Sequence, residues 1–192
     1  MRFHGRLWLA DFAAVIAAAL LAACGGSVNV VSEGGDANLM LGGHDPVAYF
    51  STGKAVLGRS DIKTEHRDLT YRFASDEDRR QFISSPDRYV PQFGAFCAQH
   101  MAYAVPVSAS ADIFKIIDGK LYLFADARAK LYFEMDQARN LDLAWRYWDS
   151  EVQDANWRFQ SFKRQMFRVP GYKTDAELAD EYRKRFGKQP PA

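Results

Sequence analysis

The stretch DIFKIIDGKLYLF, residues 112–124, decides the fold class. Two apolar runs, Asp112–Ile117 and Lys120–Phe124, flank the pair Asp118-Gly119. An Asp-Gly pair between two such runs is a strong signal for a hairpin turn, because both residues accept the positive φ angles of a tight turn. The pattern therefore predicts an antiparallel pair of strands in this part of the chain.

A second hairpin is predicted from KTEHRDLTYRF, residues 63–73, with its turn at Arg67-Asp68. Tyr71 and Phe73 share one face of its second strand at the two-residue period. Short helices are predicted beside the hairpins, because Ser75 is a good N-cap for a helix that stops before Pro86, and Asp126 is a good N-cap for another. Two hairpins with several short helices predict an α+β domain.

A long amphipathic C-terminal helix is predicted from about residue 136 to 167. Its apolar stripe advances in steps of four and three residues: Leu141, Trp145, Trp148, Val152, Ala155, Phe159, Phe162 and Met166. The same repeat is compatible with a coiled-coil seam, but Trp and Phe are bulky for two strands, which favours a helix lying over the domain. Thr174 and Glu177 form a capping box for a last helix, which Gly187 ends.

Residues 1–23 have the features of a secretory signal peptide. Arg2 and Arg6 supply the positive start, and the apolar stretch 9–23 is shorter than the ~20 residues of a transmembrane helix. The following LAACG, residues 21–25, resembles the bacterial lipobox, which predicts lipid modification of Cys24. The alternatives are an uncleaved anchor, or an ordinary signal with a chance cysteine.

The predicted mature chain is a membrane-attached protein of the bacterial envelope. By resemblance to the usual sorting signal of bacterial lipoproteins, Gly25 in place of Asp favours the outer membrane, with the domain facing the periplasm. We expect a lipidated cysteine and a flexible tether over 24–38, a domain over 39–150, and a helical extension over 151–192. Without residues 1–23 the chain keeps 23 basic and 23 acidic residues, so a nucleic-acid partner is not expected.

Several phrases of the chain resemble the YHS-domain family, in its exported branch of lipoproteins and selenoproteins. The matching phrases span most of residues 39–148, and they are GHDPVAYF (43–50), YRFAS (71–75), Phe82 with Pro86 and Tyr89, PQFGAFCA (91–98) and DGKLYL (118–123). The resemblance implies a small α+β unit of the kind found near copper and other heavy-metal transport proteins. It also implies cysteines suspected of binding metal.

This chain departs from the family pattern at two of those cysteines. Ala48 and Ala74 stand where metal-binding members have them. Cys97 matches the cysteine of the exported branch, where some relatives carry selenocysteine, and that substitution points to redox chemistry. The tail beyond about residue 151 lies outside the resemblance.

Apart from the resemblance, the residues themselves indicate a candidate site centred on Cys97. If residues 97–101 are helical, Cys97, His100 and Met101 lie on one face, and thiolate, imidazole and thioether suit a soft metal such as copper, or zinc with an oxygen ligand. His44 is a further candidate ligand, and His66 is a weaker one. A reactive thiol and an inert core cysteine are the alternatives, since lipidation of Cys24 leaves Cys97 without a disulfide partner.

Three functions follow from these observations. The leading hypothesis is a membrane-anchored periplasmic binding protein that holds copper, zinc or a small ligand near Cys97. The second is a thiol-redox protein that uses Cys97. The third is an envelope interaction module without catalysis, which contacts a partner protein through its long helix. The sequence leaves open whether the protein is an enzyme.

Overall fold

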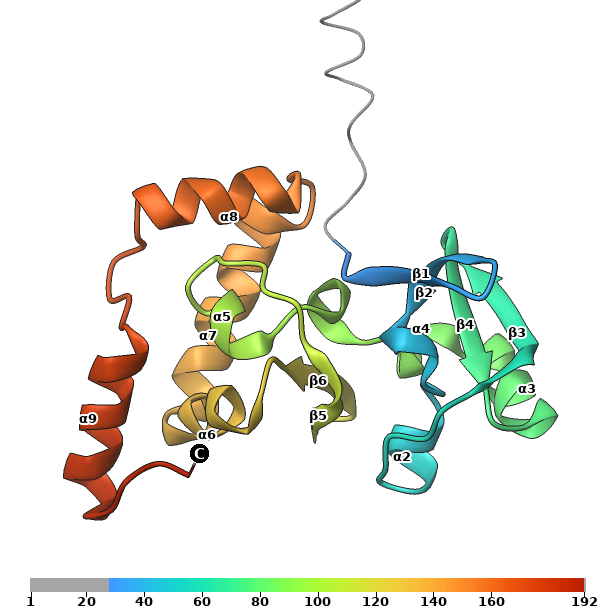
Figure 1. The fold of residues 1–192 in the computed structure, drawn as a ribbon, viewed down its shortest axis with the longest axis horizontal. Helices are drawn as coiled ribbons and strands as arrows, with labels where there is room; N and C mark the ends of the chain where they lie inside the picture. Colours follow the sequence, from blue (N-terminus) through green and yellow to red (C-terminus); the bar gives the residue numbers. More distant parts are fainter. Residues whose placement is uncertain (1–27, 192) are drawn as a thin grey trace, which may run out of the picture.

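Four strands form the larger of two sheets in the computed structural model, which describes residues 28–191 (Figure 1). The order along this sheet is β1-β2-β4-β3, and the strands are β1 (Val30–Glu33), β2 (Asp36–Met40), β3 (Arg59–His66) and β4 (Leu69–Phe73). The β2–β4 pair is parallel, and the other two pairs are antiparallel. The second sheet is the antiparallel pair β5 (Ser110–Ile117) and β6 (Lys120–Phe124). Both predicted hairpins and the α+β class are confirmed.

Both hairpin turns have the backbone that a two-residue connection requires. Arg67 and Asp68 have φ angles of 52° and 60°, and Asp118 and Gly119 have φ angles of 50° and 72°. Positive φ at both central residues matches the right-handed twist of the flanking strands. The Arg67-Asp68 tip therefore holds two charged side chains in a fixed turn.

The predicted helix caps are confirmed. The Ser75 hydroxyl accepts a hydrogen bond from the Asp78 N–H at 3.1 Å, and the Asp126 carboxylate accepts one from the Ala129 N–H at 2.7 Å. They begin α3 (Asp76–Ser84) and α6 (Ala127–Met135), and the Thr174–Glu177 capping box begins α9 (Asp175–Phe186). The shorter helices are η1 (Leu41–Gly43), α2 (Ala48–Ser51), α4 (Pro86–Tyr89), η2 (Gln92–Ala95) and α5 (Ala98–Met101).

The expected tether over 24–38 is wrong for residues 30–38, which form β1 and most of β2. The chain is already fixed just before β1, because the Asn29 N–H donates to the Gly94 carbonyl at 2.8 Å. The Asn29 side-chain amide also donates to the Ala95 carbonyl, at 3.0 Å. The predicted signal peptide and Cys24 lie outside the described residues.

The single long helix over 136–167 is also wrong. The stretch contains α7 (Gln137–Tyr147), a π-helical turn at Trp148–Val152, and a separate helix α8 (Trp157–Met166). The break has a local cause, since the Asn156 side chain accepts hydrogen bonds from the N–H groups of Arg158 and Phe159 and so begins a new helix.

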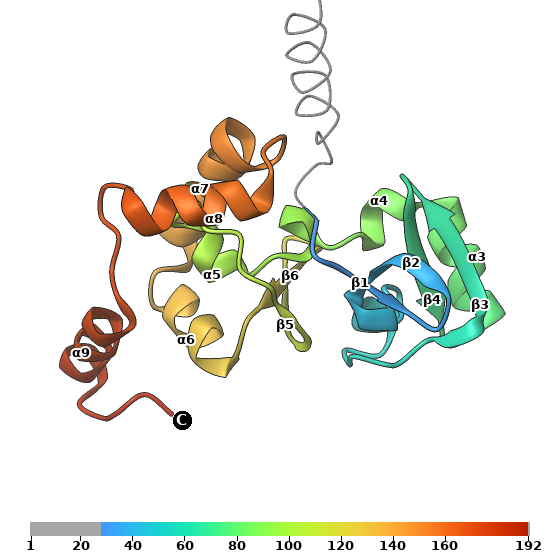
Figure 2. The ribbon, with the colours of Figure 1, turned by 45° about the horizontal axis from the view of Figure 1, so that its top comes forward.

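Two adjoining halves make up the described chain, side by side in Figures 1 and 2. We call residues 28–90 the sheet half, whose core includes Tyr49, Tyr71, Phe73 and Phe82. We call residues 91–191 the helical half, and its core includes Val152, Val169, Leu178 and Tyr182 from the predicted extension. The chain beyond residue 150 is thus packed into the domain. None of the helices in residues 28–191 is long and apolar enough to span a membrane.

Candidate functional site

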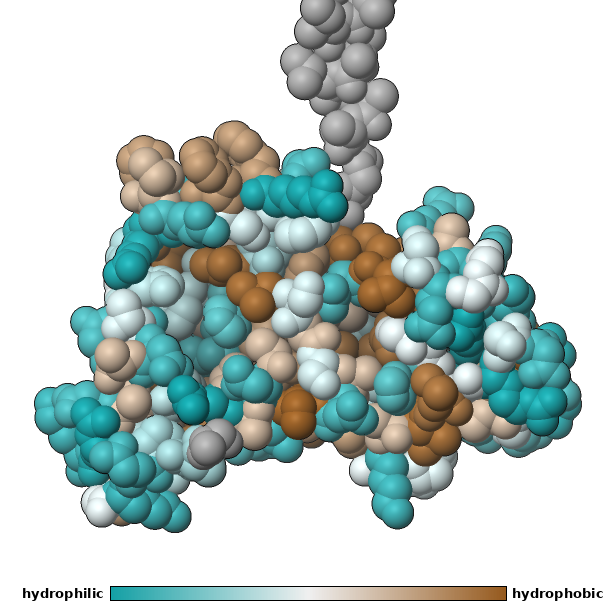
Figure 3. Space-filling model, viewed as in Figure 1, coloured by the Kyte–Doolittle hydropathy of each residue, from teal (hydrophilic) through white to brown (hydrophobic). Residues whose placement is uncertain are grey.

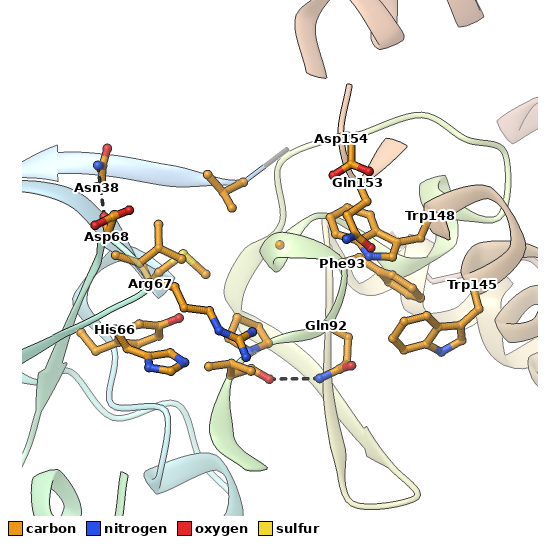
Figure 4. Close-up of a pocket in the computed structure, with 17 residues that line it drawn as sticks. Asn38, His66, Arg67, Asp68, Gln92, Phe93, Trp145, Trp148, Gln153 and Asp154 are labelled. Atoms are coloured by element: carbon orange, nitrogen blue, oxygen red, sulfur yellow. Dashed lines mark hydrogen bonds between the residues drawn. The ribbon is translucent and has the colours of Figure 1, made fainter. Parts of the chain in front are cut away.

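A groove of about 730 Å³ lies between the two halves. Figure 4 shows the β3–β4 hairpin tip on one side of it and a set of aromatic rings on the other. The lining residues come from segments far apart in the chain: Val28, Asn38, Met40, His66, Arg67, Asp68, Leu69, Tyr71, Val90, Pro91, Gln92, Phe93, Gly94, Trp145, Trp148, Gln153 and Asp154. The volume falls within the ~300–1,000 Å³ typical of small-molecule sites.

The aromatic wall consists of Phe93, Trp145 and Trp148. The ring centroid of Phe93 lies 4.8 Å from that of Trp145 and 5.8 Å from that of Trp148. The Trp145 indole N–H donates to the Tyr122 hydroxyl at 3.2 Å, and the Lys120 ammonium lies 4.8 Å from the Trp145 ring centroid. These contacts hold the rings in place, so the wall is formed before any ligand arrives.

The backbone that presents Phe93 is strained. Phe93, Gly94 and Ala95 are consecutive residues with φ angles of 55°, 56° and 65°. Left-handed backbone is costly for Phe and Ala, and such residues cluster at binding and active sites. Trp148 opens the π-helical turn, a second irregularity that is frequent at functional sites.

The polar wall is the tip of the β3–β4 hairpin. Arg67 makes an ion pair with Asp87 at 2.8 Å, and the His66 ring nitrogen Nε2 lies 3.7 Å from the same carboxylate. The Asn38 side-chain amide donates to the Asp68 carbonyl at 3.3 Å, which ties the tip to β2. The guanidinium charge of Arg67 is therefore already matched by a carboxylate.

Two carboxylates of the groove carry charge that is not matched in this way. Within residues 28–191, neither Asp68 at the hairpin tip nor Asp154 after the π-helical turn has an ion-pair partner. They lie on opposite walls, Asp68 beside Asn38 and Asp154 beside Gln153 (Figure 4). With Arg67 paired to Asp87, Asp68 and Asp154 give the lining of the groove a net negative charge, which the Lys120 ammonium over the Trp145 ring offsets in part.

Cys97, the predicted centre, is buried at the N-terminus of α5 with none of its surface exposed. Its sulfur lies 3.1 Å from the Nδ1 atom of His100, so the expected proximity of these two residues is confirmed. Burial raises the pKa of the Cys97 thiol and lowers the pKa of the His100 imidazole. Both shifts favour a neutral pair, whereas a reactive cysteine needs a stabilised thiolate.

The other two predicted ligands are not gathered into an open site. Met101 is fully buried in the core of the helical half. The Nδ1 atom of His44 lies 2.9 Å from the Leu41 carbonyl oxygen, and its Nε2 atom lies 4.0 Å from the Asp112 carboxylate. No three His, Cys, Asp or Glu side chains among the described residues form a group that could hold a metal ion.

The predicted ligands Cys97, His100, Met101 and His44 do not fit a zinc site, which uses three or four protein ligands. For copper, the described chain offers the Cys97–His100 contact inside a closed core. Metal binding at Cys97 therefore stays a prediction. The groove has the stronger basis as a site, and of the predicted ligands only the weaker candidate, His66, lines it.

Cys97 is expected to react very slowly in the folded protein. A thiol-specific reagent at neutral pH should label it at the rate of unfolding, and labelling should become fast in denaturant. The measurement is the labelling rate, followed by mass spectrometry of the peptide that contains Cys97. Fast labelling without denaturant would instead support the thiol-redox hypothesis.

The raised pKa of Cys97 also predicts a loss of stability in alkali. A folded pKa above the ordinary 9.0 means that the thiol contributes stability below that value, and that this contribution is lost as the pH rises towards the folded pKa. The unfolding midpoint of the wild type should fall more steeply above pH 9 than that of Cys97→Ala. If the unfolding midpoints of the wild type and of Cys97→Ala fall equally above pH 9, the raised pKa of Cys97 is contradicted.

The groove is the part of the site that sequence reasoning missed. Its signals were visible only separately, as the charged turn at Arg67-Asp68, the Phe93-Gly94 break and the Trp145–Trp148 pair. Both tryptophans belong to the predicted apolar stripe, which favours a place in the core. They are half-buried, and they pack against the core of the helical half while facing the groove.

Comparisons of the chain with models of known protein families, with curated proteins and with solved structures found no match. Membership of the YHS family therefore stays a prediction from the quoted phrases.

Proposed function

We propose that this chain is a non-catalytic binding protein, attached to the bacterial envelope by a lipid on Cys24, that holds a small organic cation in the groove. The observation that carries the proposal is the pairing of an aromatic wall with two carboxylates that have no ion-pair partner within the described residues. The sequence features of residues 1–25 support the attachment. The proposal keeps the binding class expected from the sequence and moves the ligand from Cys97 to the groove.

A cation suits both walls of the groove. An ammonium group over the face of Trp148 gains cation–π energy, since Trp145 already has the Lys120 ammonium over its ring, and the carboxylates of Asp68 and Asp154 attract the same charge. An anion would meet two carboxylates, and Arg67 is already engaged by Asp87. A neutral ligand would leave the carboxylates unused, so the groove discriminates in favour of positive charge.

The two alternatives have less support. A thiol-redox role needs access to Cys97, which is fully buried, and a stabilised thiolate, which burial opposes. An interaction module would use the exposed apolar side chains of α8, and these do not account for the aromatic wall and carboxylates of the groove. The groove is accordingly the feature on which we base the function.

Titration with tetramethylammonium and with spermidine, followed by tryptophan fluorescence, tests the proposal. We expect saturable quenching by one or both cations and none by glucose or benzoate. Asp154→Asn should weaken binding by about tenfold, because it removes one of the two unmatched charges. The matched control is Asp142→Asn, which removes an exposed carboxylate paired with Arg146 outside the groove.

Two results would overturn the proposal. The first is equal responses to the cations and to glucose. The second is an equal loss of binding in Asp154→Asn and Asp142→Asn, which would place the attraction in the overall charge of the protein rather than in the groove. Trp148→Leu provides a further check, since it removes a ring from the wall without changing any charge.

A further inference from the structure

Helix α8 is oriented with its polar side towards the protein and its apolar side towards solvent. Phe159, Phe162 and Met166 are 66%, 60% and 65% exposed, and Phe167 just after the helix is 69% exposed. Figure 3 shows the resulting hydrophobic patch over α8. We call these four side chains the α8 patch. A surface helix of a soluble domain normally has the opposite orientation.

The inward side of α8 is held by polar contacts, which fix the orientation. The side-chain amide of Gln160, which is buried, donates to the Ala104 carbonyl at 3.0 Å. The Ser161 hydroxyl donates to the Pro106 carbonyl at 3.1 Å, and Arg164 pairs with Glu151. The exposed patch is therefore a consequence of specific bonds on the opposite side of the helix.

The charge around the patch has one sign. Residues 157–168 contain four basic side chains and no acidic one: Arg158, Lys163, Arg164 and Arg168. Glu151 pairs with both Lys163 and Arg164, so it offsets one of the four charges. At 100° per residue, Arg158 and Lys163 lie on the two edges of the stripe formed by Phe159, Phe162 and Met166. An apolar stripe with basic edges is the pattern of a helix that lies in a membrane interface.

The patch faces the same side of the molecule as the start of the described chain. In Figures 1 and 2, α8 and the first residues before β1 both lie at the upper side of the view. Four residues lead from Cys24 to Val28, and four residues span at most ~14 Å when fully extended. Because Asn29 is bonded to Gly94 and Ala95, a lipid on Cys24 would hold this side of the domain close to the bilayer.

We propose that the α8 patch docks on the surface of an anionic lipid bilayer, with Phe159, Phe162 and Met166 among the acyl chains and the basic edge residues at the headgroups. A second copy of the chain fits less well, because a symmetric contact would bring the basic edges of two helices together. The proposal goes beyond ligand binding in the groove. It makes α8 a second contact with the membrane, in addition to the proposed lipid.

Photo-crosslinking of the full chain tests the docking. p-Benzoylphenylalanine is placed at position 162, or at the control position 186, where Phe186 on α9 is 52% exposed. Each protein is reconstituted in phosphatidylglycerol–phosphatidylethanolamine vesicles and irradiated, and the adducts are identified by mass spectrometry. We expect lipid adducts at position 162 and few at position 186.

Charge dependence is the second arm of the experiment. Arg158→Gln with Arg168→Gln, high salt, or neutral phosphatidylcholine vesicles should each lower the yield of lipid adducts at position 162 by about threefold or more. Adducts from position 162 to a protein chain would show that a protein covers the patch, and would overturn the proposal. Equal lipid yields at 162 and 186, no adducts at either, or yields independent of lipid charge would overturn it as well.

Discussion

Asp45→Ala is expected to lower the free energy of unfolding by about 3–5 kcal/mol, enough to unfold much of a marginally stable domain. Asp45 is fully buried, and its carboxylate accepts three backbone hydrogen bonds. The donors are the N–H groups of Val47 at 2.8 Å, Ala48 at 3.3 Å and Ala74 at 2.8 Å. Alanine would leave these three donors without an acceptor inside the protein, which costs about 1–3 kcal/mol for each.

Thermal and urea unfolding, followed by circular dichroism, measure this effect. Asp45→Asn should be intermediate, because its amide oxygen still accepts while its NH₂ group faces one of the donors. Asp61→Ala is the control, since it removes an exposed carboxylate that pairs with Arg59. An unfolding midpoint for Asp45→Ala within a degree or two of that control would mean that the three hydrogen bonds are not what holds this turn.

Asp45 also illustrates how far the sequence can predict the fold. Its role in a turn was predictable, because Val47 lies two residues away and Asp commonly bonds the backbone of its own turn. The bond to Ala74 joins residues 29 positions apart, and no local pattern indicates it. The hairpin turns and the helix caps were predicted correctly for the same reason, since their signals lie within a few residues.

The long helix was mispredicted because the spacing of apolar residues does not show where a helix axis changes direction. The stripe from Leu141 to Met166 keeps its spacing across the break, although the chain turns at Asn156. Val152 before the break is fully buried, whereas Phe159 after it is exposed. Apolar spacing therefore indicated helical structure on both sides of the break but not the break itself, and the separate orientations of α7 and α8 depend on the Asn156 cap and on the buried contact of Gln160.

The candidate site was predictable only in part, for related reasons. His100 lies in α5 and Cys97 is the N-cap residue of that helix, so their contact was predictable from their three-residue spacing. The groove combines the hairpin tip, the strained segment at Phe93 and the end of α7, which are brought together by the packing of the two halves. Single-sequence patterns do not encode such a juxtaposition, so the groove could not be predicted.

Gly58→Ala is expected to destabilise the protein by about 3 kcal/mol or more, through a clash with backbone atoms. A Cβ atom at Gly58 would lie 2.6 Å from the carbonyl carbon of Arg72 and 2.7 Å from the nitrogen of Phe73. Both atoms belong to β4, which cannot withdraw without disturbing its pairing with β3. The Gly58 N–H also donates to the Gly43 carbonyl at 2.9 Å, so the segment cannot easily move away either.

The destabilisation should come from the added Cβ atom at position 58 and not from any substitution in this segment. Ser60→Ala, two residues along in an exposed position of β3, is the matched control and should change the unfolding midpoint little. The clash should also weaken the groove, because β3 and β4 carry its polar wall at Arg67 and Asp68. If Gly58→Ala has the same unfolding midpoint as Ser60→Ala, β4 can shift at this point. If it then also binds tetramethylammonium as the wild type does, the hairpin tip is held by contacts other than the strand pairing below it.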